Sequence, residues 1–99
     1  MDPLRDLQEW FASVCNGDWE HTFGVTIQTL DNPGWSVDID LQDTELEGRD
    51  FTPVTIERTE RDWLHCFVRD GRFAIRCGSS NLEEALGHFT RWSGAATFS

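Results

Sequence analysis

Three residues, His65, Cys66 and Arg72, have the spacing in this sequence that most suggests catalysis. A His-Cys pair followed by five residues and an Arg is the spacing of the phosphate loop in cysteine-dependent phosphatases, and rhodanese-type sulfurtransferases have a related loop. That chemistry needs a Cys thiolate of lowered pKa among backbone amides at a helix N-terminus, with the Arg binding the anion. A sulfurtransferase or phosphatase that uses Cys66 and Arg72 is therefore the alternative hypothesis for function.

The residues around this pattern predict a hairpin rather than a phosphate loop. Residues 63–68 are typical of a strand, Asp70-Gly71 favours a tight turn, and Arg72 would then begin another strand instead of a helix. Phe67 is too bulky for a ring of amides around an anion, and Asp70 would repel that anion. The context thus indicates a structural Cys66.

Metal binding is the second chemistry that the residue types suggest. The residues concerned are three His and three Cys, but none of them is paired at the spacing of known ligand motifs. We expect no metal and no cofactor. An odd number of scattered Cys favours reduced, mostly buried side chains over disulfides. These six residues are His21, His65, His88, Cys15, Cys66 and Cys77.

Acidic residues dominate the charge of the chain. It has 18 Asp or Glu and eight basic residues, giving a formal net charge of −10. This excess argues against direct binding of nucleic acid and favours a basic protein partner. Asp38 and Asp40 are expected on one side of a strand, with Asp31 in the turn before it. Such a face is either solvated, which keeps the protein soluble, or a docking surface.

Hydrophobic periodicity predicts two helices around a set of strands. Asp2 and Pro3 fit the start of the first helix, and Asn16-Gly17 fits its end. A capping box beginning at Ser80, or the equivalent frame beginning at Asn81, predicts the start of the second helix, which ends at Gly94. Alternating or apolar runs predict strands over residues 24–29, 35–41, 51–58, 63–68 and 72–77.

These elements predict an α+β fold in a single domain over residues 1–99, with a core over 4–93 and a tail over 95–99. The expected architecture is an N-terminal helix, about five antiparallel strands in a meander, and a C-terminal helix. Both helices would form a single layer on one face of the sheet. Trp19 lies outside any periodic run, so we expect it to be partly exposed. The predicted core includes Trp35, Ile39, Phe89 and Trp92.

Two blocks of sequence resemble the immunity protein 53 family of bacterial polymorphic toxin systems. They are Cys15-Asn16-Gly17-Asp18-Trp19-Glu20-His21 and Thr29-Leu30-Asp31-Asn32-Pro33-Gly34-Trp35, and the likeness runs from about Leu4 to Trp92. Asn81-Leu82-Glu83-Glu84 in the last helix belongs to it too. Phe11 and Phe23 depart from the family pattern, since many members have Tyr there.

The resemblance implies an immunity protein that binds and neutralises a cognate toxin in the cytoplasm of the producing bacterium, without catalysis. Together with the charge, it favours a basic toxin, and nucleases are one such class. No apolar run of membrane-spanning length and no basic-then-apolar leader is present, so no membrane role is expected. The residues that we expect to contact the toxin, with Trp19 as an anchor, are Asp18, Trp19, Glu20, His21, Asp31, Asp38 and Asp40.

Overall fold

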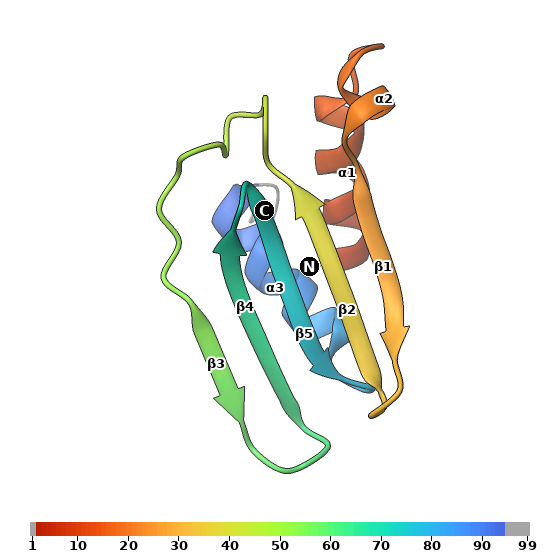
Figure 1. Cartoon of the computed structure of the whole chain (residues 1–99), viewed down its shortest axis with the longest axis vertical. Helices are drawn as coiled ribbons and strands as arrows, with labels where there is room; N and C mark the ends of the chain where they lie inside the picture. Colours follow the sequence, from red (N-terminus) through yellow and green to blue (C-terminus); the bar gives the residue numbers. More distant parts are fainter. Residues whose placement is uncertain (1, 95–99) are drawn as a thin grey trace.

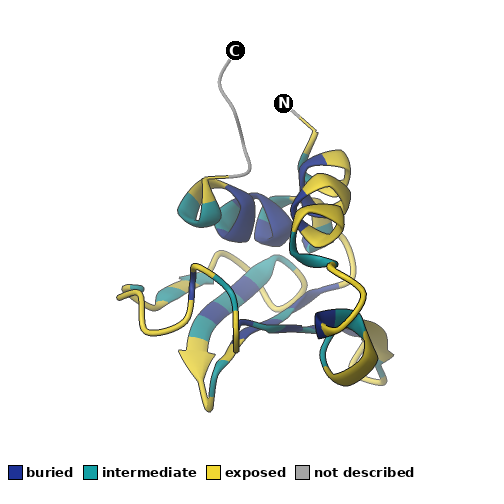
Figure 2. Cartoon of the chain, turned by 90° about the horizontal axis from the view of Figure 1, so that it is seen from above, coloured by how far each residue is buried: buried dark blue, intermediate teal, exposed yellow. Residues whose placement is uncertain are grey.

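The computed structural model of the chain describes residues 2–94. Five strands form one antiparallel sheet, and α1 and α3 lie on the same face of it (Figures 1 and 2). This confirms the predicted α+β fold with a single layer of helices; the predicted tail, residues 95–99, lies outside the described residues. The elements are α1 (Pro3–Val14), α2 (Trp19–Thr22), β1 (Val25–Leu30), β2 (Gly34–Asp40), β3 (Val54–Glu57), β4 (Trp63–Arg69), β5 (Arg72–Gly78) and α3 (Leu82–Ser93).

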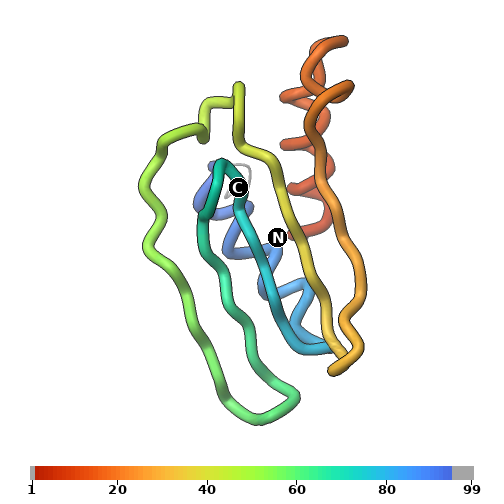
Figure 3. Tube along the Cα trace, in the orientation of Figure 1, coloured from red at the N-terminus to blue at the C-terminus, as the bar shows by residue number. Residues whose placement is uncertain are grey.

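The strand order is β1-β2-β5-β4-β3, so the predicted meander is wrong at one step. β2 pairs with β5 instead of β3, in a register that places Val37 opposite Ile75 and Ile39 opposite Phe73. The chain between β2 and β3 passes around the end of the β4–β5 hairpin to the far edge of the sheet (Figure 3). β5 takes the centre because most of its residues are buried, and a buried strand needs a neighbour on each side.

The start of α1 and the end of α3 lie at signals that the sequence carries, whereas α1 ends at Val14, with Cys15 as its C-cap, before the predicted Asn16-Gly17 stop. The Asp2 side chain accepts a hydrogen bond from the Arg5 amide at 3.2 Å, and Pro3 occupies the first turn of α1. Gly94 ends α3 in the left-handed conformation, with φ of +83°.

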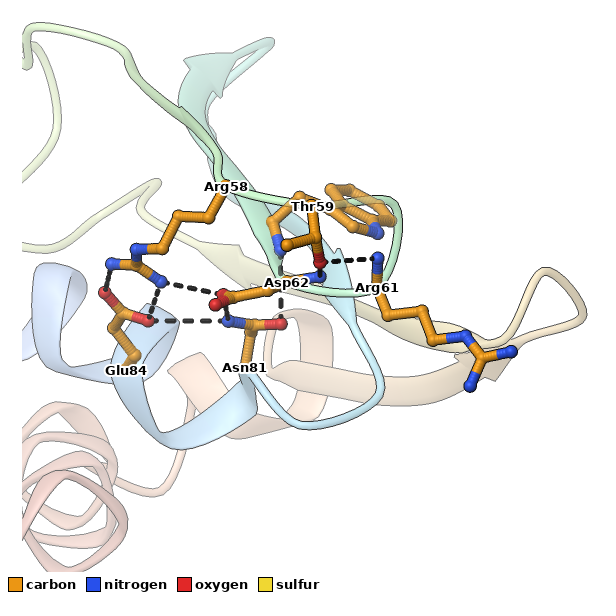
Figure 4. Close-up of polar contacts among 7 residues, drawn as sticks. Arg58, Thr59, Arg61, Asp62, Asn81 and Glu84 are labelled. Atoms are coloured by element: carbon orange, nitrogen blue, oxygen red, sulfur yellow. Dashed lines mark hydrogen bonds and ion pairs between the residues drawn. The ribbon is translucent and has the colours of Figure 1, made fainter.

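Of the two predicted frames for the start of α3, the structure has the one that begins at Asn81, which is the N-cap. The capping bond itself is not formed, because the Asn81 side chain caps no helical amide. Its Oδ1 accepts from the Trp63 amide at 3.3 Å, and its Nδ2 donates to Asp62 at 2.8 Å. Asp62 and Glu84 in turn bind the Arg58 guanidinium, at 2.8 and 2.6 Å (Figure 4). This network ties the first turn of α3 to the connection between β3 and β4.

The core lies between the helices and one face of the sheet, and aromatic rings form its centre. Phe89 of α3 contacts Trp10 of α1 and Phe73 of β5 edge-on, with ring centroids 5.0 and 5.1 Å apart. The predicted burial of Ile39 and Phe89 is confirmed. Trp35 and Trp92 are only partly buried and pack at the edge of the core, where their indole nitrogens donate to the carbonyls of Ser79 and Asp50.

We expect Phe89→Ala to destabilise the protein by about 3–5 kcal/mol, because it leaves a cavity where three elements meet. Chemical denaturation followed by tryptophan fluorescence measures this. Phe67→Ala is the matched control, since Phe67 is half-exposed on the opposite face and stacks on Arg69. It should cost about 1 kcal/mol or less. Equal losses in the two variants would contradict the assignment of the core.

The Arg58 network should make stability depend on pH. The hydrogen bond from Arg58 lowers the pKa of Glu84. Hydrogen bonds from Asn81 and, to a smaller extent, Arg58 lower the pKa of Asp62. A carboxylate with a lowered folded pKa stabilises the folded state at neutral pH, and this contribution is lost as the pH falls through that pKa.

Arg58→Gln should therefore lower the Tm at about pH 7 and have less effect at about pH 2, well below the ordinary pKa values of Asp and Glu. Arg61→Gln is the control, because the Arg61 side chain points away from the network (Figure 4). Thermal unfolding at the two pH values measures the difference. A Tm loss for Arg58→Gln that is the same at both would exclude this source of pH dependence.

Candidate functional site

The segment between α1 and β1 is held by side chains that bond to the backbone. Asn16 Oδ1 accepts from the amides of Asp18 and Trp19, both at 2.9 Å. The Glu20 carboxylate accepts from the amides of Asn16 and Gly17 at 3.0 and 2.8 Å. Gly17 has φ of +88°, which few other residues adopt. These bonds form the short helix α2, which the sequence analysis did not predict.

Glu20 thus has a structural role besides its charge. Backbone hydrogen bonds, first that of its own amide and then those of Asn16 and Gly17, lower the pKa of its carboxyl group. The Asp18 side chain, by contrast, makes no capping bond. Asp18 and His21 are exposed beside it.

The predicted exposure of Trp19 is wrong. Its side chain is 4% exposed and packs in the core between Trp10 and Phe23. Its indole nitrogen donates to the Gln42 carbonyl at 2.8 Å, which satisfies the one polar atom of the ring. Trp19 therefore connects α2 to the end of β2, and in this conformation it offers a partner no anchor.

Asp38 and Asp40 lie on the uncovered face of the sheet, as predicted, but neither carries a free charge. Asp40 pairs with Arg72 at 2.9 Å and accepts from the Gly24 amide at 3.0 Å. Asp38 pairs with Arg76 at 3.4 Å. Both arginines come from β5, the neighbour of β2 that the sequence did not reveal. The uncovered face is thus charge-balanced around these two residues, and the acidic excess expected on this strand face is offset there by arginines.

The remaining acidic candidates lie at opposite ends of β1. Asp18 and Glu20 precede the strand in α2, whereas Asp31 is exposed in the turn after it. Six residues of extended chain separate the two groups by roughly 20 Å. The seven predicted contact residues therefore do not form one cluster, although these three and His21 flank the same edge strand (Figure 1).

A cleft of about 830 Å³ lies between α1, the loop after β2 and the end of α3. Trp10, Val14 and Leu46 supply its apolar lining, and the carboxylates of Glu9, Asp43 and Glu45 contribute its charge. Glu9 also lies 3.7 Å from Arg5, in an exposed pair. Such a surface suits a basic side chain from a protein partner better than an anionic ligand.

A family model described as immunity protein 53 matches residues 4–94 of the 99-residue chain. The chain belongs to the immunity protein 53 family. The match extends from the second residue of α1 through the end of α3. No curated protein and no solved structure matches the sequence significantly.

The residue blocks by which this immunity protein resembles its family have visible structural roles. Gly17, Trp19 and Glu20 build the α1–α2 connection, as described above. Asn32-Pro33 forms a cis peptide bond in the β1–β2 turn. Gly34 lies against the Cys77 carbonyl, where a Cβ atom would sit 2.2 Å away, so that no larger residue fits. These shared residues therefore shape the edge of the sheet.

The charge of the immunity protein is strongly asymmetric along the chain, a signal that the sequence analysis missed. Residues 1–48 contain eleven Asp or Glu and one Arg, whereas residues 49–99 contain seven acidic residues and seven Arg. The net charge of −10 therefore belongs to α1, α2, β1, β2 and the start of the next loop. In Figure 1 these elements occupy one side of the molecule. Counting charges by halves of the chain would have found it.

The Cys66–Arg72 pattern does not form a phosphate loop in this protein. Both residues lie in the β4–β5 hairpin, but Cys66 faces the core, 1% exposed, whereas Arg72 pairs with Asp40 on the opposite face. Burial raises the pKa of the Cys66 thiol to about 12, away from a reactive thiolate. Among residues 2–94, no group of three His, Cys, Asp or Glu has the geometry to hold a metal. No helix in that range is long and apolar enough to span a membrane.

Alkylation of Cys66 should therefore be slow in the folded protein and fast after denaturation. Iodoacetamide labelling at about pH 7.5, resolved by peptide mass spectrometry, measures this. Cys15 is the internal comparison, because it is half-exposed at the end of α1. If folded Cys66 reacted faster than Cys15, the thiol would be activated and the enzyme hypothesis would regain support.

Proposed function

We propose that this immunity protein binds a cognate protein toxin in the cytoplasm of the producing bacterium and neutralises it without catalysis. The family match carries the proposal. Immunity by binding needs a stable folded surface and no reactive group, and a core-facing Cys66 is consistent with that. The three described cysteines are free, as suits a reducing compartment.

The acidic half of the chain, residues 1–48, is the surface that we propose for the toxin. Its exposed carboxylates at Asp18, Asp31, Asp43 and Glu45 belong to the stretch between Arg5 and Arg49, in which His21 is the one basic residue. A field of one sign attracts a basic partner and speeds association. We therefore expect a basic toxin. Nucleases bind nucleic acid through basic surfaces, so they are the toxin class that an acidic inhibitor suits best.

A survival assay tests immunity directly. The C-terminal domain of the toxin encoded beside this gene is induced in cells with the wild-type protein, with Cys66→Ser, or with neither. We expect both forms to rescue growth fully, because Cys66 contributes packing alone. Loss of rescue by a folded Cys66→Ser would support the enzyme hypothesis instead. Death in every strain would refute immunity against this toxin.

Charge variants test the acidic half. Asp18→Asn with Asp31→Asn should slow association with that toxin domain by roughly three- to tenfold at low salt, and less at high salt. Glu60→Gln with Asp70→Asn is the control. It removes the same charge from residues 49–99, whose acidic and Arg residues balance, and should change the association rate by less than about twofold. Stopped-flow tryptophan fluorescence gives both rates. Equal effects of the two pairs would place the toxin elsewhere.

A further inference from the structure

β1 forms one edge of the sheet, so part of its backbone has no strand beside it in the described chain. The Asp40 amide donates to the Gly24 carbonyl at 3.0 Å. Because bonded and non-bonded pairs alternate along an antiparallel ladder, Thr26 and Gln28 also bond to β2. The amides and carbonyls of the residues between them, Val25, Ile27 and Thr29, point outward from the sheet.

β1 lacks the features that commonly keep edge strands from pairing. Its sequence, Val-Thr-Ile-Gln-Thr-Leu, contains no charge and no Pro, in a chain of which 26% is charged. The opposite edge, β3, is protected: it has four residues, follows Pro53, ends with the charged Glu57 and is followed by Arg58. The sheet thus has one blocked edge and one open edge.

An apolar groove of about 370 Å³ runs between the open edge and α1. Of the four large apolar side chains that are exposed in the described part of the chain, three line it: Leu4 (54%), Phe11 (37%) and Ile27 (40%). None of the groove's lining residues is charged. A strand added to β1 would direct every second side chain toward this groove.

Charge decides which strand fits. Asp18 and Glu20 lie before β1 and Asp31 lies after it, with no Arg or Lys in the segment. If two copies of this chain paired their β1 strands antiparallel about a two-fold axis, Asp31 of each would approach the acidic α2 of the other. Like charges would then meet at both ends. A partner strand with Arg or Lys at its ends would meet opposite charges there.

We propose that an extended strand of the toxin adds to β1, pairing with the backbone of Val25, Ile27 and Thr29. Its apolar side chains on one face enter the groove beside α1, and Arg or Lys residues near its ends face Asp18, Glu20 and Asp31. This assignment rests on the proposed function, because the toxin is the partner. Main-chain bonds give such a contact its affinity, and the groove and the end charges give it specificity.

Two variants separate the backbone and side-chain parts of this contact. Thr29→Pro removes one outward amide and none that bonds to β2, so the fold should persist and toxin binding should weaken by about tenfold or more. Ile27→Ala shortens a side chain in the groove and should weaken binding by about three- to tenfold. Val68→Ala is the matched control, since Val68 is 37% exposed but lies outside the groove in β4.

The probe is the C-terminal toxin domain used in the survival assay, with affinities from calorimetry and folding checked by circular dichroism. Amide exchange by NMR, with and without the domain, should show new protection at Val25, Ile27 and Thr29. A complex that forms without this protection, and whose affinity is unchanged in the β1 variants, overturns strand addition and leaves immunity standing. Wild-type protein that fails to bind the domain overturns both. Protection that grows with protein concentration alone, with a doubled mass in light scattering, identifies a second copy and also overturns the proposal.

Discussion

The contact of Phe89 with Trp10 and Phe73 holds the molecule together, because it joins α3, α1 and the central strand β5 in one cluster of rings. Edge-to-face aromatic pairs add to the free energy of burying the rings themselves. This cluster commits one face of the sheet, and one stripe of each helix, to the core. What is left for a partner is the uncovered face, the open edge of β1 and the cleft beside α1. The position of the core therefore limits where binding can occur.

Local signals in the sequence were sufficient for the two long helices, the five strands and the helical layer, but not for α2. Alternation predicted the strands, and Asp2 and Gly94 marked helix ends that the structure confirms. Pairing between distant strands has no local pattern, so the β2–β5 contact was missed. For the same reason the ion pairs of Asp38 and Asp40 were not foreseen, because their arginine partners lie more than thirty residues away. Trp19 was misplaced for a similar reason, since its burial depends on Trp10 of α1 and on the chain after β2, whose Gln42 carbonyl accepts from its indole.

The residues that resemble the family and the residues proposed to bind the toxin are largely different. Gly17 and Gly34 fix backbone geometry, whereas Leu4, Phe11 and Ile27 add little to the core because they are exposed. Substitutions in the second group therefore cost little folding stability. A lineage can change them to follow a changing toxin and keep the same scaffold. Asp18 and Asp31, at the ends of β1, are the exception, since both lie in the blocks that resemble the family.

The pairing of β2 with β5 determines when, during synthesis, the β1–β2 hairpin becomes stable. β2 is complete at residue 40, but its central neighbour ends at residue 78, and α3 follows that. The hairpin of β1 and β2 has no stable support until those later residues have left the ribosome, because a lone two-stranded hairpin is marginal in water. A nascent or prematurely terminated chain therefore lacks a supported β1 edge, and under the proposed function it would bind no toxin until α3 has been made.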